Sequence, residues 1–114
     1  MRTAADHRAD LARDMLERDL QAKVLRIARD LGYELTYHTH DSRRSNPGFP
    51  DLVLLSLRRG RVLYRELKTE RGRVSPDQQR WLVALREVGC DAGVWRPTDL
   101  LDGTVVRELT GSTP

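Results

Sequence analysis

The sequence of 114 residues contains a single cysteine, Cys90. One thiol cannot form an internal disulfide, and it cannot build a cysteine-based zinc site. The chain also lacks an apolar run long enough to span a bilayer, and residues 1–14 mix charges throughout, without the apolar block of a signal peptide. We therefore expect a soluble protein of a reducing, cytoplasmic compartment, without a membrane partner.

Several chemical signatures are missing as well. The sequence has no glycine-rich phosphate loop, no dinucleotide-binding fingerprint and no serine or cysteine arrangement typical of a covalent nucleophile. These absences argue against a nucleotide-driven enzyme, a dehydrogenase and a serine or cysteine hydrolase. No small-molecule cofactor is expected.

Basic residues are abundant, and nearly all of them are arginine. The chain carries 20 Lys and Arg against 17 Asp and Glu, which gives a formal net charge of +3. All of the basic residues except Lys23 and Lys68 are arginines, whose planar fork grips phosphate oxygens two at a time. This composition fits a polyanionic partner. The codon bias of a GC-rich genome would explain it equally well, so charge alone leaves both explanations open.

Hydrophobic periodicity predicts one α/β domain, a mixed central β-sheet flanked by helices. The length suits a single core, placed at residues 10–114 after a flexible lead-in over residues 1–9. The expected helices cover 10–31 and 75–89, with room for a short helix in 98–109. The expected strands cover 33–38, 51–57, 62–68 and 92–95, joined by a loop over 40–48, a turn over 58–61 and a basic loop over 69–74.

The predicted hairpin brings three polar residues together. If Leu57 faces Val62 across the turn, Asp51 lies opposite Lys68. Glu66 is two residues before Lys68, so both side chains share one face of the sheet. A slip of one residue would send Asp51 to the other face and dissolve the cluster. The pairing around the turn therefore decides whether a site exists.

Two neighbouring carboxylates suggest a site for a hard divalent cation. Asp51 and Glu66 would repel each other unless a cation lies between them, and Mg²⁺ takes one or two carboxylates together with waters and substrate phosphate. Lys68 beside such a cation can orient or deprotonate a water and neutralise developing negative charge. The alternative is that Asp51 ends a turn while Glu66 and Lys68 form an ion pair worth at most about 1 kcal/mol.

The order of motifs resembles a known family. Gly-Phe-Pro-Asp-Leu-Val-Leu at 48–54, Arg-Glu-Leu-Lys-Thr at 65–69 and Ser-Pro-Asp-Gln-Gln-Arg-Trp-Leu at 75–82 resemble VRR-NUC domains, the virus-type replication-repair nuclease branch of the PD-(D/E)XK superfamily. The resemblance runs over about residues 17–95. It implies a restriction-endonuclease-like fold and hydrolysis of DNA phosphodiesters with Mg²⁺ or Mn²⁺, leaving 5′-phosphate and 3′-hydroxyl ends.

The resemblance also implies roles for individual residues. Asp51, Glu66 and the backbone carbonyl of Leu67 would hold the metal, and Lys68 would be catalytic. Such families often add an acid from the first helix, where Glu17 stands, and Glu17 and Gln21 could face the end of the sheet. Both could equally be solvated helix residues.

Further candidates lie around the predicted site. Gln78 completes a capping box with Ser75, which explains it nearly as well as contact with the site or a phosphate. His38 and His40 lie at the mouth of the site and could bind phosphate or a leaving oxygen. Phosphate contacts are expected from the loop arginines Arg43, Arg44, Arg71 and Arg73. Three arginines, Arg58, Arg59 and Arg61, are expected to form a solvated hairpin tip, and Trp81 and Trp95 to fill the core.

Function follows as a hypothesis with two rivals. The leading hypothesis is metal-dependent hydrolysis of DNA. If two copies pair as a homodimer, the substrate could be branched or junction DNA. The rivals are a DNA-binding module without activity and a docking subunit that acts only within a larger complex. The presence of Asp51, Glu66 and Lys68 together weighs against the DNA-binding module, which requires at least one site residue to be missing. An origin in a phage or mobile element is an analogy alone.

Overall fold

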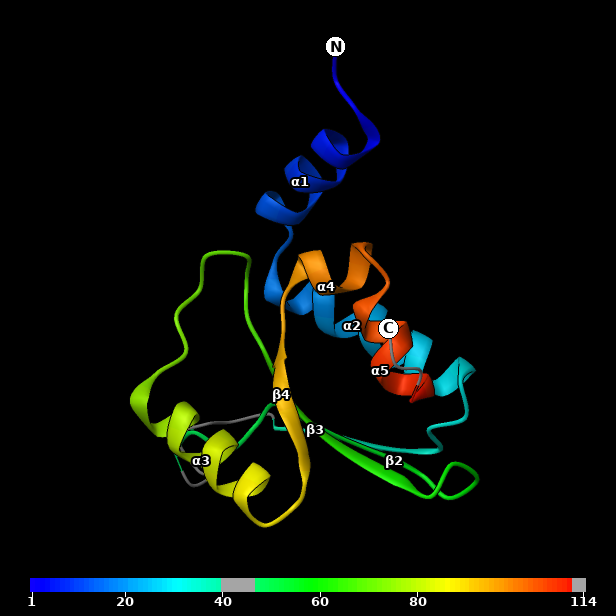
Figure 1. The fold of residues 1–114 in the computed structure, drawn as a ribbon, viewed down its shortest axis with the longest axis vertical. Helices are drawn as coiled ribbons and strands as arrows, with labels where there is room; N and C mark the ends of the chain where they lie inside the picture. The colour runs from blue at the N-terminus through cyan, green and yellow to red at the C-terminus, as the bar shows by residue number, and fades with distance from the viewer. Residues whose placement is uncertain (40–46, 112–114) are drawn as a thin grey trace.

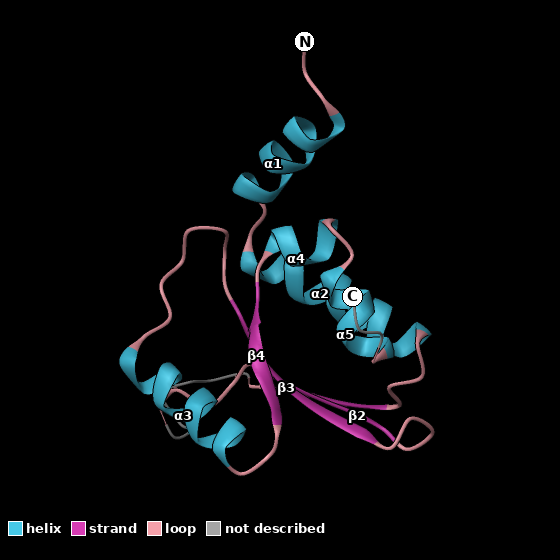
Figure 2. Ribbon diagram, viewed as in Figure 1, coloured by secondary structure: helices cyan, strands magenta, loops and turns pink. Residues whose placement is uncertain are grey.

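The computed structural model describes residues 1–39 and 47–111 (Figure 1). Helices α2, α4 and α5 gather on one side of the sheet and α3 on the other (Figure 2). This confirms the predicted α/β arrangement. No helix within the described ranges is long and apolar enough to cross a membrane. The elements are α1 (Ala4–Asp14), α2 (Glu17–Asp30), β1 (Leu35–His38), β2 (Leu52–Ser56), β3 (Arg61–Leu67), α3 (Pro76–Glu87), β4 (Asp91–Trp95), α4 (Pro97–Leu101) and α5 (Thr104–Thr110).

The sheet is mixed, with the strands in the order β1-β2-β3-β4. Strands β1, β2 and β3 form an antiparallel meander, and β4 returns parallel to β3 after the crossover through α3. A parallel pair needs such a crossover because its strands enter from the same end. The carboxyl ends of β3 and β4 therefore lie at one end of the sheet, beside the start of β2.

One face of the sheet, the core face, carries the main hydrophobic core. It presents leucines from β2 and β3, together with Trp95 from β4, to helices α2 and α5. Tyr33 joins this core and donates a hydrogen bond from its hydroxyl to the carbonyl of Leu109 at 2.6 Å, which ties α5 to the start of β1. The fully buried core leucines of β2 and β3 are Leu52, Leu54, Leu63 and Leu67.

The opposite face, the open face, carries Val53, Leu55, Val62 and Tyr64, which are all partly exposed. Helix α3 packs over the β4 side of this face (Figure 2). Because side chains alternate along a strand, Asp51 and Glu66 belong to the open face too.

The hairpin register differs from the prediction by two residues. Val62 pairs with Leu55 rather than with Leu57, and a four-residue turn over 57–60 joins the strands. Continuing this register places Asp51 opposite Glu66 instead of Lys68. The predicted pairing was wrong, but a shift of two residues keeps every side chain on its predicted face, since the strand repeat is two.

The expected helix over 10–31 is two helices. Met15 and Leu16 take extended backbone angles between α1 and α2, and Leu16 is exposed instead of lying on the buried stripe. Residues 4–9, expected to be irregular, are helical because Thr3 and Asp6 form a capping box at the start of α1. Helix α1 lies away from the sheet, next to α4 (Figure 1). The domain boundary at residue 10 stays a prediction.

The hairpin arginines form a solvated tip only in part: Arg58 is exposed, as predicted, whereas Arg59 and Arg61 are half-buried. Arg58 and Arg59 donate to the carbonyl of Leu31, at the carboxyl end of α2, where cations offset the helix dipole. Arg61 donates to the Leu109 carbonyl and to the carboxylate of Asp91. These contacts fix the hairpin turn against α2 and α5.

Candidate active site

Four side chains from different elements meet at the end of the sheet where β3 finishes. Asp51 directly precedes β2, and Glu66 is the second-last residue of β3. Lys68 follows β3, and Gln78 is in the first turn of α3. The even spacing of Glu66 and Lys68 and the register of β2 with β3 put them on the open face. The structure thus brings together three residues predicted to form the site and Gln78.

Asp51 is held by the backbone of the neighbouring strand. Its Oδ2 accepts a hydrogen bond from the amide of Leu67 at 2.8 Å. Thr39 donates its amide to the Asp51 carbonyl at 2.9 Å, which continues the β1–β2 pairing past the last strand residue. A carboxylate fixed on one oxygen keeps the other available for a ligand.

Glu66 is almost completely buried, at 2 % exposed. Its Oε2 accepts from the Gln78 side-chain amide at 2.9 Å and lies 3.5 Å from the Lys68 ammonium. Its Oε1 is buried without a hydrogen-bond partner among the described residues. A buried carboxylate oxygen without a partner is costly, so the arrangement is incomplete without an added cation or donor.

The electrostatics point the same way. Burial and then the negative charge of the nearby Asp51 raise the pKa of the Glu66 carboxyl to about 8, against the opposing effect of Lys68. Two carboxyl groups that cannot both ionise easily are relieved when a divalent cation lies between them. The donor set therefore suits a hard cation such as Mg²⁺, which uses few protein oxygens and keeps several waters.

Glu17 is near this pair without joining it. Partial burial and the charge of Asp51 raise the pKa of the Glu17 carboxyl, while Lys68 lowers it. Within residues 1–39 and 47–111, no three His, Cys, Asp or Glu side chains gather closely enough to hold a metal ion. Gln21 lies one turn further along α2 and is half-buried. The metal-binding role of Glu17 and the DNA-binding role of Gln21 stay predictions.

Gln78 serves both of the roles that the sequence left open. Its Oε1 accepts from the Ser75 amide at 2.8 Å, while the Ser75 hydroxyl accepts from the Gln78 amide at 3.2 Å. This is the expected capping box. The remaining Nε2 group donates to Glu66, so the start of α3 positions the buried carboxylate.

The predicted phosphate contacts are partly described. Arg71 and Arg73 are exposed on the loop between β3 and α3. His38 is the last residue of β1 and pairs with Leu52. His40, Arg43 and Arg44 lie outside the described residues. Contact of any of them with DNA stays a prediction.

Two residues that support the site were missed by sequence reasoning. Arg96 donates from Nη1 to the carbonyls of Thr69, Glu70 and Gly72 at 2.7–3.2 Å, and so fixes the loop that follows Lys68. Nothing in the local sequence of Arg96 indicates these long-range contacts. Gly48 has a φ of +88°, and a Cβ there would lie 2.4 Å from the backbone of Asp77. Its place at the head of the Gly-Phe-Pro-Asp motif was the available signal.

The sheet and the residues at its end define a nuclease-type α/β domain. A VRR-NUC domain model matches residues 3–98, which extends the resemblance through α1. The chain belongs to the VRR-NUC family.

Two solved structures have a similar fold. One, described as a VRR_NUC domain protein, is 18% identical with a TM-score of 0.64, over 83% of this chain and 90% of that one. Another, described as a VRR_NUC domain, is 24% identical with a TM-score of 0.54, over 75% of this chain and 92% of that one. No protein with a curated description matches.

Proposed function

We propose that this protein is a Mg²⁺- or Mn²⁺-dependent endonuclease that hydrolyses DNA phosphodiester bonds. The observation that carries the proposal is the buried Glu66 Oε1, which has no hydrogen-bond partner in the described part of the chain and lies beside Asp51 and Lys68. Membership of a nuclease family and the excess of arginine support it.

Each residue has a part in this mechanism. Asp51, Glu66 and the Leu67 carbonyl would hold the cation, with Glu17 near enough to assist through water. When bound, the cation polarises the scissile phosphate and offsets negative charge on the leaving oxygen.

The protein's own groups do the rest. Gln78 holds the Glu66 carboxylate in position, and the Nζ of Lys68 lies 3.5 Å from that carboxylate. As the ammonium, Lys68 would orient the attacking water; as the neutral amine, it would take a proton from that water. Water adds to phosphorus, the bond to the 3′ oxygen breaks, and that oxygen takes up a proton. The products are a 5′-phosphate and a 3′-hydroxyl. Arg71 and Arg73, exposed beside the site, would bind flanking phosphates.

The finer expectations belong to the same proposal. One chain offers one site, so a homodimer would bring two sites to a branched or four-way junction. The arginine-rich loops favour DNA as the partner, and a cytoplasmic location belongs to the same proposal.

The direct test is cleavage of end-labelled single-stranded, duplex, flap and four-way-junction DNA by the purified protein with Mg²⁺, Mn²⁺ or EDTA. Cleavage only with metal, giving ends that a ligase accepts, is the expected result. Lys68→Ala should abolish cutting and retain DNA binding. Lys23→Ala is the matched control, since Lys23 is the other lysine of the chain and is exposed on α2.

Other outcomes discriminate among the rivals. A protein that binds DNA without cleaving it, and whose metal binding in calorimetry is absent or is the same in Asp51→Ala, would favour a DNA-binding module. Metal binding without cleavage of any substrate would favour a subunit that is active only in a complex.

A further inference from the structure

Aromatic side chains gather on the open face. Of the six aromatic residues in the chain, Tyr33 and Trp95 are buried in the core. The other four connect with one another on the opposite side. Tyr37 in β1 pairs with Val53, and Val53 pairs with Tyr64 in β3, so all three share a face.

Ring contacts extend this line from the sheet to α3. Phe49 meets Tyr64 edge to face with ring centroids 6.4 Å apart, and it meets Trp81 edge to face at 5.1 Å. We call Tyr37, Tyr64, Phe49 and Trp81 the aromatic row. It runs across the open face from the outer strand β1 to α3.

The aromatic row lies next to the paired carboxylates. Asp51 is two residues before Val53 on β2, and Glu66 is two residues after Tyr64 on β3. Side chains two residues apart on a strand point to the same face and are about 7 Å apart along it. The carboxylates therefore occupy the adjacent line of side chains on the same face.

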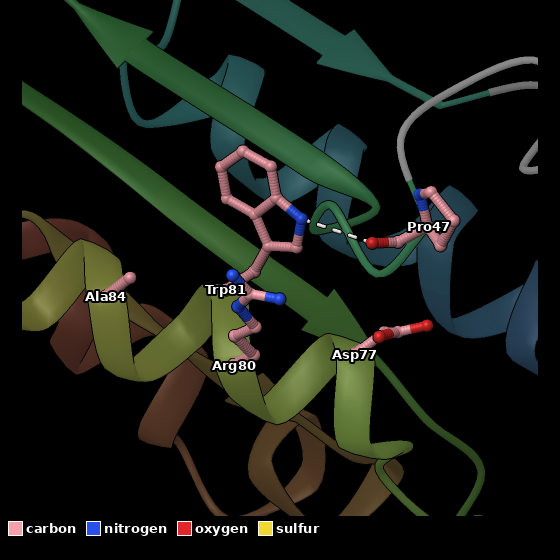
Figure 3. Close-up of a pocket in the computed structure, with 5 residues that line it drawn as sticks. All are labelled: Pro47, Asp77, Arg80, Trp81 and Ala84. Carbon is pink, nitrogen blue, oxygen red and sulfur yellow. Dashed lines mark hydrogen bonds between the residues drawn. The ribbon is translucent and has the colours of Figure 1, made fainter.

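Both ends of the aromatic row can be reached from solvent. Tyr37 is 58% exposed, beside the similarly exposed Leu35. Trp81 lines an open cavity of about 440 Å³ together with Pro47, Asp77, Arg80 and Ala84 (Figure 3). Its indole Nε1 donates to the Pro47 carbonyl at 3.1 Å, which fixes the ring. Core packing explains Phe49 and Tyr64, but it does not explain a tyrosine that stands mostly in water.

We propose that Tyr37 and Trp81 are stacking sites for unpaired bases, so that the DNA segment beside the cut is single-stranded. This inference rests on the proposed function, which supplies DNA as the substrate. Aromatic rings bind unpaired bases by stacking, with little dependence on sequence, and Arg80 adds a cation beside Trp81. In a duplex the base faces are already stacked on each other, so they cannot engage the row. An aromatic ring at each end of the row, with the carboxylates in the adjacent line of side chains, suits a single DNA strand that crosses the open face.

The test uses the two tryptophans of the chain. Trp95 is fully buried, so Trp81 is the tryptophan that a ligand can reach. A 12-residue thymidine oligonucleotide, added in EDTA to prevent cleavage, should quench the fluorescence of the full-length protein. Trp81→Phe should remove the quenching and keep most of the affinity, because a ring remains.

Removing rings should weaken binding of the single strand alone. Trp81→Leu and Tyr37→Ala should each raise its Kd roughly 5- to 100-fold, the equivalent of ~1–3 kcal/mol per stacked base. Tyr37→Phe should bind like the parent protein. The matched control is Leu35→Ala, which removes an equally exposed apolar side chain from the same face. Affinity for a blunt duplex should stay unchanged in every variant.

Contrary results are equally clear. The inference is wrong if quenching is absent, if single strand and duplex are affected equally, or if Leu35→Ala weakens binding as much as Tyr37→Ala. It is also wrong if these substitutions instead dissociate a dimer in light scattering, since the face would then be a protein interface. Tyr37 is exposed, so its variants remain informative should Trp81→Leu fail to fold.

The same measurements separate this inference from the proposed function. Ring-dependent binding of the single strand without cleavage under any metal would sink the nuclease proposal alone. Metal-dependent cleavage with no effect of the rings would sink the stacking proposal alone.

Discussion

Replacing Glu66 with glutamine should stabilise the metal-free protein at alkaline pH, although it destroys the site. Glutamine has the shape of the neutral carboxyl, and its oxygen can still accept from Gln78. It cannot ionise, so it avoids the cost of a buried negative charge beside Asp51. Metal-site carboxylates are often placed at such a cost to the empty protein.

The magnitude follows from the raised pKa of Glu66, about 8 in place of the ordinary 4.5. Between those two values the folded protein holds a proton that the unfolded chain has released, so the free energy of unfolding falls as pH rises. Each pH unit is worth about 1.4 kcal/mol, so the total loss over 3.5 units is on the order of 5 kcal/mol. It is absent below pH 4.5 and complete above pH 8. Glu66→Gln lacks this loss.

The assay is urea unfolding of both proteins in EDTA at pH 5.5 and pH 9. Near pH 5.5 most of the loss has not developed, so the two stabilities should lie within about 1–2 kcal/mol. At pH 9 the variant should be more stable by a few kcal/mol. Titrating groups that do not interact with Glu66 are common to both proteins and cancel in the difference.

Without EDTA, added Mg²⁺ should raise the urea concentration at the unfolding midpoint of the parent protein at pH 9. It should leave the midpoint of Glu66→Gln unchanged, because a ligand stabilises only the state that binds it. A difference in stability that does not vary with pH, or a variant that is less stable at pH 9, would refute the reasoning about buried charge.

Two further predictions concern the loops that frame the site. Arg96→Ala should lower kcat at least tenfold without unfolding the protein, because it removes the donor to three carbonyls in residues 69–72. Amide hydrogen exchange should become faster in that loop alone, and unchanged exchange there would contradict the prediction. Gly48→Ala should cost more than about 2 kcal/mol by urea unfolding, because it adds a clash to a positive φ, whereas Gly60→Ala, with a positive φ and no atom within 4 Å, should cost about 1 kcal/mol. Equal costs would show that the clash with α3 is relieved elsewhere.

The fold class and the clustering of Asp51, Glu66 and Lys68 could be predicted because both depend on local patterns. The continuous apolar run within 51–57, followed by a turn containing Gly60 and the returning segment 62–68, predicts paired strands, and the Ser75 capping box predicts the start of α3. Each of these signals is contained within a few neighbouring residues. None of them needs knowledge of how distant segments pack.

The features that escaped prediction depend on tertiary contacts or on weak periodicity. Helix α1 buries only Ala12, so its sequence has almost no apolar stripe to detect, and its cap was the available signal. Trp81, expected in the core, is only partly buried and lines an open cavity. The arginines of the hairpin turn bind carbonyls of α2 and α5, which lie far away in the chain.

The site also explains why a wrong register still predicted the right cluster. A strand places side chains on a face every second residue, so an error of two residues moves Asp51 along the face without moving it off. It exchanged the expected neighbour Lys68 for Glu66, and this exchange matters chemically. Opposite Lys68, Asp51 would form an ordinary ion pair, whereas opposite Glu66 it raises the pKa of a buried carboxyl. The four-residue hairpin turn, together with the choice of acids, therefore decides whether this end of the sheet suits a divalent cation.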